Sequence, residues 1–177
     1  MMSWIKQTEL IIREEKPEDI PHVSNLINLS FKNSATGTLV NMLRERKDFI
    51  YPLSLVAEIN ETIIGYILLS PIKIQTADQE IKTLWLEPVC VHPKYQKKGI
   101  GSALIKHALE ISKKMEYESV FVNGSPDYYP RFGFKQASEF GIEPSIAVSP
   151  EVFLALELKK NTLTHKGILI YPEEIFD

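Results

Sequence analysis

The segment between residues 82 and 122 constrains the fold more than any other part of the sequence. It contains a predicted strand at residues 82–91, a polar loop, a predicted helix at residues 100–115 and a second, short strand at residues 119–122. Apolar residues at helical spacing give the helix one buried face: Leu104, Ala108, Ile111 and Met115. Two strands joined through a helix in this way are expected to lie parallel, with a right-handed crossover.

Antiparallel pairing is predicted earlier in the chain. Residues 54–59 and 62–69 are rich in aliphatic and β-branched side chains, and the Asn-Glu pair between them favours a tight hairpin turn. Pro71 is expected to interrupt the second of these strands, which is expected to resume through Ile72 and Ile74. Pro88 lies inside the strand that precedes the polar loop, where it removes a hydrogen-bond donor, so a bulge or an unpaired edge is expected there.

Shorter elements complete the pattern. We expect a strand at residues 10–13, a helix that begins at Pro17, a weaker helix at residues 38–46, a turn or single helical turn at residues 126–132, and a late strand at residues 151–158. The order predicts an α/β fold of the α+β kind, in which a mixed, mostly antiparallel sheet of about six to seven strands is flanked by helices.

Composition limits the classes of protein to which the chain can belong. Its 177 residues are 44% hydrophobic, which is enough for a single globular domain over residues 1–177. The 20 Lys and Arg residues are balanced by 23 Asp and Glu, so the excess of cations that a nucleic-acid-binding protein needs is absent. Cys90 is the single cysteine, which excludes an intramolecular disulfide and a cysteine-rich zinc site and favours a cytoplasmic setting.

The sequence favours neither a membrane nor a metal. Its longest apolar run, residues 63–69, is far shorter than the roughly 20 residues that cross a bilayer, and its N-terminal residues lack the basic start and apolar block of a secretory signal. The histidines are scattered without the spacing of metal ligands, and His92 is expected to act as a turn residue. We therefore expect a soluble protein with no membrane or nucleic-acid partner and no metal cofactor.

The polar loop at residues 92–102 carries the densest chemical signal. Gly99 and Gly101 let the chain turn tightly where the helix begins, which exposes successive backbone N–H groups at the positive end of the helix dipole. This arrangement is typical of a diphosphate-binding loop, although a solvated, lysine-rich turn explains the same residues. The glycine spacings of a nucleoside-triphosphate loop and of a dinucleotide-binding fold are absent. The side chains that would assist an anion site are Lys94, Lys97, Lys98 and Ser102.

Two motifs, in order, resemble those of the GNAT superfamily of acyl-CoA N-acyltransferases. Residues 96–101, Gln-Lys-Lys-Gly-Ile-Gly, are similar to the family's Gln/Arg-x-x-Gly-x-Gly/Ala loop. Residues 128–134, Tyr-Tyr-Pro-Arg-Phe-Gly-Phe, resemble its second hallmark, a tyrosine ahead of Gly-Phe. The resemblance covers most of residues 10–134, and residues 135–177 are expected to add C-terminal strands and a tail.

The resemblance implies a site for acetyl-CoA as the acyl donor. In the family, the pantetheine arm lies in a gap between two diverging parallel strands and pairs with strand backbone, which here assigns it to Val89, Cys90 and Val91. Asn123, near the end of the second parallel strand, is also assigned to cofactor binding. The residues assigned to the diphosphate are Gln96, Lys97, Lys98, Gly99, Ile100, Gly101 and Ser102.

The resemblance also implies that a primary amine attacks the thioester directly in a ternary complex. Tyr129 would protonate the leaving sulfur, because its spacing to the Gly-Phe pair matches the family motif, and Tyr128 is the alternative. Glu87 is the candidate base that deprotonates the amine, although a solvated strand position explains it equally well. Cys90 is expected to be a small apolar strand residue and not a nucleophile.

These inferences predict an acetyl-CoA-dependent N-acetyltransferase. The alternative is a non-catalytic acyl-CoA-binding or sensor module of the same fold, which would need the loop but neither Tyr129 nor a base. The acceptor is expected to be a small-molecule or peptide amine, bound by residues 30–51 and 135–158. Homodimers are common in the family, so a homodimer is compatible with the resemblance.

Overall fold

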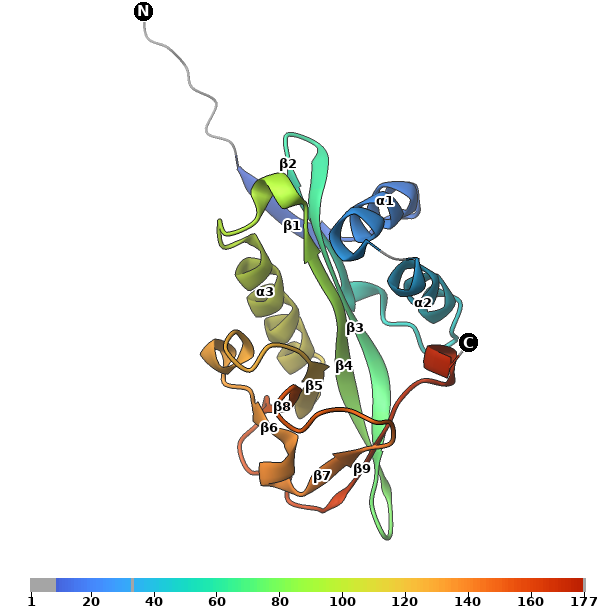
Figure 1. The fold of residues 1–177 in the computed structure, drawn as a ribbon, viewed down its shortest axis with the longest axis vertical. Helices are drawn as coiled ribbons and strands as arrows, with labels where there is room; N and C mark the ends of the chain where they lie inside the picture. The colour runs from blue at the N-terminus through green and yellow to red at the C-terminus, as the bar shows by residue number, and fades with distance from the viewer. Residues whose placement is uncertain (1–8, 33, 177) are drawn as a thin grey trace, which may run out of the picture.

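The computed structural model describes residues 9–32 and 34–176, and within them nine strands form one open sheet (Figure 1). The strand order is β1-β2-β3-β4-β5-β8-β6, while β9 pairs with the end of β3 and with β7. The strands are β1 Leu10–Glu14, β2 Ser54–Ile59, β3 Thr62–Gln75, β4 Glu80–Val91, β5 Ser119–Asn123, β6 Lys135–Gln136, β7 Ile142–Pro144, β8 Phe153–Glu157 and β9 Gly167–Ile170.

Helices cover both faces of the sheet. Helices α1 (Ile20–Phe31) and α2 (Ala35–Arg44) lie on one face, and α3 (Ile100–Lys114) lies on the other (Figure 1). No helix among the described residues is long and apolar enough to cross a membrane. The short 3-10 helices are η1 Pro17–Asp19, η2 Tyr51–Leu53, η3 Pro93–Tyr95, η4 Tyr129–Phe132, η5 Ala137–Phe140 and η6 Glu173–Phe176.

Three groups of buried apolar side chains fill the space between helices and sheet. Helix α3 and the central strands enclose the first, which includes Leu86 and Leu104. Helices α1 and α2 cover the second, around Ile27 and Tyr66. The third surrounds Trp85 and is closed by the C-terminal strands. Each face of β4 therefore contributes to a different part of the core, as expected for alternating side chains in a strand.

The predicted mixed α/β class is confirmed, with more strands than the six or seven expected. The additional strands are short: β6, β7 and β9 have two to four residues each, too few to show an alternating pattern in the sequence. The predicted hairpin between β2 and β3 is present. Helix α2 begins at Ala35, three residues earlier than expected, and ends at Arg44.

The expected interruption at Pro71 is wrong. Strand β3 continues through Pro71, which pairs with Leu84 of β4. On the other side of β3, pairing with β2 ends at Leu68 and pairing with β9 begins at Lys73. Pro71 therefore lies where β3 has one neighbour only, so its missing N–H removes no bond from that open side.

The expected bulge at Pro88 is confirmed. Ile67 pairs with Val89 and Leu69 pairs with Leu86, so two residues of β4 stand opposite one residue of β3. These two residues are Glu87 and Pro88, and the peptide bond between them is cis. The bulge places Glu87 at a bend in the strand.

Strands β4 and β5 pair in parallel, as predicted, but only over a short distance. The pairs are Leu84 with Val120 and Trp85 with Phe121. Beyond Trp85, the edge of β4 that faces β5 has no strand partner among the described residues. The two strands therefore part at their carboxyl ends and leave the backbone of residues 87–91 on an open edge.

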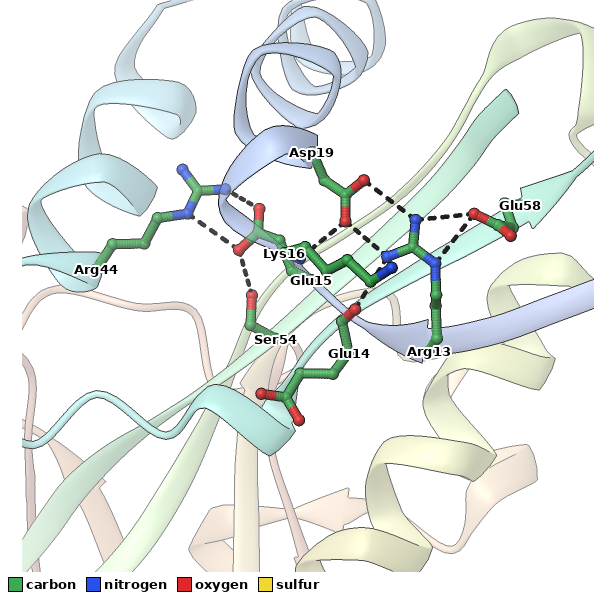
Figure 2. Close-up of polar contacts among 8 residues, drawn as sticks. All are labelled: Arg13, Glu14, Glu15, Lys16, Asp19, Arg44, Ser54 and Glu58. Atoms are coloured by element: carbon green, nitrogen blue, oxygen red, sulfur yellow. Dashed lines mark hydrogen bonds and ion pairs between the residues drawn. The ribbon is translucent and has the colours of Figure 1, made fainter. Parts of the chain in front are cut away.

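A polar network fastens β1 to α1 and α2 (Figure 2). Arg13 of β1 donates to Asp19 at 2.6 Å and to Glu58 at 2.8 Å, and the bond from Arg13 lowers the pKa of Asp19. Beside this cluster, Arg44 of α2 forms an ion pair with Glu15, whose side chain is 5% exposed. Buried ion pairs of this kind are strongly destabilised when one partner is removed, so the network holds both helices over the sheet.

Candidate functional site

The loop between β4 and α3 is held in a tight turn. His92 accepts a hydrogen bond at Nδ1 from the backbone N–H of Lys94 at 3.2 Å, so it serves as the expected turn residue. Lys97 and Gly99 adopt left-handed conformations with φ of 60° and 83°. A residue with a side chain would be strained in the conformation of Gly99. These turns direct the chain into α3, which begins at Ile100.

The N–H groups at the start of α3 are available to a ligand. Among the described residues, the backbone N–H groups of residues 96–102 donate to no protein acceptor, and the first helical bond runs from Ala103 N–H to the carbonyl of Gly99 at 3.0 Å. The first N–H groups of a helix have no partner within the helix, and the helix dipole adds positive charge at this end. The arrangement can therefore bind an anion.

A cavity of about 450 Å³ lies over these N–H groups. It is lined by Val91, Tyr95, Gln96, Lys97, Gly99, Ile100, Gly101, Ser102, Tyr128 and Arg131. Most of the residues assigned to the diphosphate are thus brought together. Lys98 is the exception, because its Nζ lies over the Tyr95 ring, 5.5 Å from the centroid, and not in the cavity lining.

Sequence reasoning missed the part that the second motif plays in this cavity. The Tyr128 hydroxyl is 3.2 Å from Ser102 Oγ, and the Arg131 guanidinium lies 4.5 Å from the centroid of the Tyr128 ring. Arg131 adds a cation to the cavity wall. Its place in the Tyr-Tyr-Pro-Arg segment was visible in the sequence, but the distance between the two motifs in space was not.

Gly65 brings α3 close to the sheet. A β-carbon at this position would lie 3.0 Å from Leu104 and 3.3 Å from Ile100. Gly65 pairs with Val91, the last residue of β4. Because no side chain separates them, the first turn of α3 packs directly on the sheet beside the open edge of β4. Gly65 was also missed, since nothing local in the sequence requires glycine there.

The residues assigned to the pantetheine arm lie on the open edge of β4. The side chains of Val89 and Val91 pack toward α3, whereas Cys90 belongs to the buried group covered by α1 and α2. Burial raises the pKa of the Cys90 thiol to about 12, so the thiol stays protonated near neutral pH. This agrees with the expected role as an apolar strand residue. Gln96 donates from Nε2 to the Val91 carbonyl at 3.1 Å.

The carboxyl group of Glu87 lies where burial raises its pKa. It is partly buried at the bulge of β4, and burial raises its pKa from 4.5 to about 7. Its charge also raises the pKa of the Tyr129 hydroxyl, so the two groups are close enough to interact. A carboxyl group with this pKa can accept a proton from a substrate at neutral pH.

Tyr129 is held firmly by its packing. Its side chain is 7% exposed, and its ring packs edge-on against Phe134 with centroids 5.5 Å apart. Its hydroxyl has no hydrogen-bond partner among the described residues, and burial raises its pKa, so the group keeps its proton near neutral pH. Gly124, which sequence reasoning missed, makes room for the ring: a β-carbon there would lie 2.2 Å from Tyr129 Cε2.

Asn123 lies apart from the loop cavity. It is the last residue of β5, where β5 has parted from β4, and its Oδ1 accepts a hydrogen bond from the Tyr171 hydroxyl at 2.7 Å. The structure therefore groups the predicted residues in two neighbouring places. One is the N–H-rich cavity at α3, and the other is the opening between β4 and β5 near Glu87, Asn123 and Tyr129.

Comparison with known proteins agrees with this arrangement. Residues 11–137 match a family model described as an acetyltransferase (GNAT) domain. The uncharacterized N-acetyltransferase YhbS of Escherichia coli K12 is 35% identical over 130 residues, which is 73% of this chain and 75% of that protein. The uncharacterized N-acetyltransferase YjhQ of the same strain is 31% identical over 117 residues, covering 66% of this chain and 65% of that protein.

Two solved structures are similar over nearly the whole chain. The Escherichia coli YhbS structure in complex with CoA has a TM-score of 0.88 and 27% identity, and covers 96% of this chain and 93% of that one. A GNAT family acetyltransferase from Brucella melitensis in complex with acetyl-CoA has a TM-score of 0.77 and 27% identity, with coverage of 97% and 100%. The likeness therefore extends beyond the residues that the family model matches.

Proposed function

The chain belongs to the GNAT acetyltransferase family, and we propose that it transfers an acetyl group from acetyl-CoA to a primary amine by direct attack in a ternary complex. The proposal is carried by the backbone N–H groups of residues 96–102, which donate to no protein acceptor among the described residues and belong to a loop that lines a cavity beside the open edge of β4. The complexes of similar proteins with CoA and acetyl-CoA support the choice of donor.

The donor would lie across the two neighbouring places of the site. Its diphosphate would accept hydrogen bonds from the loop at residues 96–102, with Arg131 adding positive charge at the cavity wall. Its pantetheine arm would run along the open edge of β4 and pair with the backbone of Val89 to Val91, as an added strand does. No metal is needed for this chemistry.

The transfer requires a base and an acid. An amine with an ordinary pKa near 10 must lose a proton before it attacks, and Glu87 would accept that proton directly or through water. Backbone N–H groups near Val89 to Val91 would stabilise the negative charge that develops on the thioester oxygen. Tyr129 would donate its proton to the departing sulfur, since its hydroxyl is protonated and has no other partner among the described residues.

Tyr129 is a better candidate for the acid than Tyr128. The Tyr128 hydroxyl lies next to Ser102 at the start of α3, in the cavity assigned to the diphosphate. The Tyr129 hydroxyl interacts with Glu87, which lies at the opening between the strands. The sulfur of a donor bound along β4 would lie near this opening.

The test measures thiol release from acetyl-CoA in the presence of a panel of small-molecule and peptide amines. We expect the wild-type protein to release thiol with at least one amine. Tyr129→Phe should lower kcat by about 100-fold while the affinity for CoA stays the same, because only a proton donor is lost. The matched control is Tyr117→Phe, at a tyrosine outside the segments assigned to the acyl donor and to the acceptor, which should behave as wild type.

Two results would contradict the proposal. Tight CoA binding without thiol release for any amine would favour a non-catalytic acyl-CoA-binding module of the same fold. An unchanged kcat in Tyr129→Phe would remove this tyrosine from the mechanism.

A further inference from the structure

Tyr171 brings the C-terminal segment to the opening between β4 and β5. It follows β9 directly, where the chain crosses from the C-terminal strands toward α2 (Figure 1). Its side chain is 3% exposed, and its backbone N–H donates to Ser145 Oγ at 3.2 Å. Tyr171 lies outside the residues that the family model matches, and no motif in the sequence pointed to it.

Tyr171 contacts both β4 and β5 at the point where these two strands diverge. The last paired residues of β4 and β5 are Trp85 and Phe121, and Glu87 and Asn123 each lie two residues further along. Because side chains alternate along β5, Asn123 lies on the face of Phe121, while Glu87 lies at the bulge of β4, close enough to Tyr171 to raise its pKa. Both Trp85 and Phe121 belong to the same buried group, so this is one face of the sheet.

Tyr171 is fixed on this face by two interactions. Its ring packs edge-on against Trp85, with centroids 5.4 Å apart and an interplanar angle of 84°. Its hydroxyl donates to Asn123 Oδ1 at 2.7 Å. The charge of Glu87 and, more strongly, burial raise the pKa of Tyr171 to about 12, so the hydroxyl remains a donor near neutral pH.

The hydrogen bond from Tyr171 selects one orientation of the Asn123 carboxamide. A carboxamide has an acceptor end and a donor end, and its terminal torsion is soft enough to exchange them. The hydroxyl holds the oxygen, so the NH₂ group is directed away from Tyr171. This NH₂ group has no hydrogen-bond partner among the described residues.

We propose that Tyr171 is a positioning residue for the acyl donor: by holding Asn123 Oδ1, it directs the Asn123 NH₂ group into the opening between β4 and β5, where that group donates to the bound acyl-CoA. The nature of the ligand rests on the proposed function. The role of Tyr171 itself rests on its contacts with Trp85 and Asn123 at the point where the strands part.

Calorimetric titration with CoA tests the proposal in four proteins: wild type, Tyr171→Phe, Asn123→Ala and the double variant. Phenylalanine keeps the ring contact with Trp85 and removes only the hydroxyl. We expect Tyr171→Phe to weaken CoA binding by about five- to tenfold, the value of one hydrogen bond. Asn123→Ala should cause a similar loss, and the double variant should bind no more weakly than Asn123→Ala, because Tyr171 acts through Asn123.

The control separates positioning from a structural role. Tyr117→Phe, outside every segment assigned to the donor or the acceptor, should bind CoA as the wild type does. If Tyr171 only held the C-terminal segment in place, Tyr171→Phe would lower the melting temperature and leave the CoA affinity unchanged, which overturns the proposal. The proposal would also be overturned if the loss of CoA affinity in the double variant equalled the product of the losses in the two single variants. A wild-type protein that binds no CoA would instead refute the proposed function, and this inference with it.

Discussion

The burial of Glu87 predicts that the protein becomes less stable as the pH rises through neutrality. Between pH 4.5 and about 7, the Glu87 carboxyl loses its proton in the unfolded chain but keeps it in the folded protein. The folded state then binds more protons, so the free energy of unfolding falls with increasing pH in this window. Below pH 4.5 both states are protonated and the effect vanishes.

The Glu87→Gln variant measures this effect directly, because glutamine has nearly the same shape and never ionises. A pKa raised from 4.5 to about 7 corresponds to about 3 kcal/mol of destabilisation at pH 8 and above. Glu87→Gln should therefore be more stable than wild type by about 3 kcal/mol at pH 8. For a chain of this length, the melting temperature should rise by about 6–12 °C.

The assay is urea unfolding of both proteins from pH 4 to pH 9. We expect the difference in unfolding free energy to be close to zero at pH 4 and to reach its full value near pH 8. Glu139→Gln, at an exposed position, should show no such trend and serves as the control. A difference of the same size at every pH, or a variant less stable than wild type at pH 8, would refute the reasoning.

Three further substitutions test separate parts of the structure. Gly124→Ala should lower kcat by about 100-fold with little change in CoA affinity, because the Tyr129 ring must withdraw by about 1 Å; an unchanged kcat would mean that the position of Tyr129 is unimportant. Gly101→Glu should weaken CoA binding by about 100-fold or more in calorimetry, since its carboxylate would occupy the cavity; wild-type affinity would refute the site. Arg44→Ala should lower the free energy of unfolding in urea by about 3–5 kcal/mol, because it leaves the buried Glu15 carboxylate without its partner. Arg46→Ala, at a more exposed ion pair, should lower it by less than about 1 kcal/mol, and equal losses in the two variants would contradict this.

Local sequence signals predicted the parts of the fold and site that depend on neighbouring residues. The helix over α3 follows from apolar spacing, and the turn before it follows from Gly99 and Gly101. The bulge in β4 follows from Pro88, because a proline cannot donate to its neighbouring strand. All these features arise within about ten residues of chain, so periodicity and backbone preference reveal them.

Features that depend on distant contacts could not be read from the sequence. Pro71 was expected to interrupt a strand, but β3 accepts it because one side of β3 has no neighbour at that point. That open side depends on where β2 and β9 pair with β3, which no local pattern predicts. Gly65 and Gly124 are required by side chains that approach from α3 and η4. Tyr171 donates a hydrogen bond to Asn123, which is 48 positions away, and no local pattern predicts that contact.

The site residues divide in the same way. The loop at residues 96–102 was identified because its motif is contiguous. The elevated pKa of Glu87 could not be foreseen, since it results from burial by parts of the chain that are distant in sequence.

The position of the diphosphate in a crystal structure of the protein with CoA tests the central claim most directly. We predict that its oxygens lie about 3 Å from backbone nitrogens within residues 96–102, with the pantetheine arm along the β4 edge. A diphosphate bound elsewhere, with those N–H groups engaged by protein atoms instead, would contradict the account.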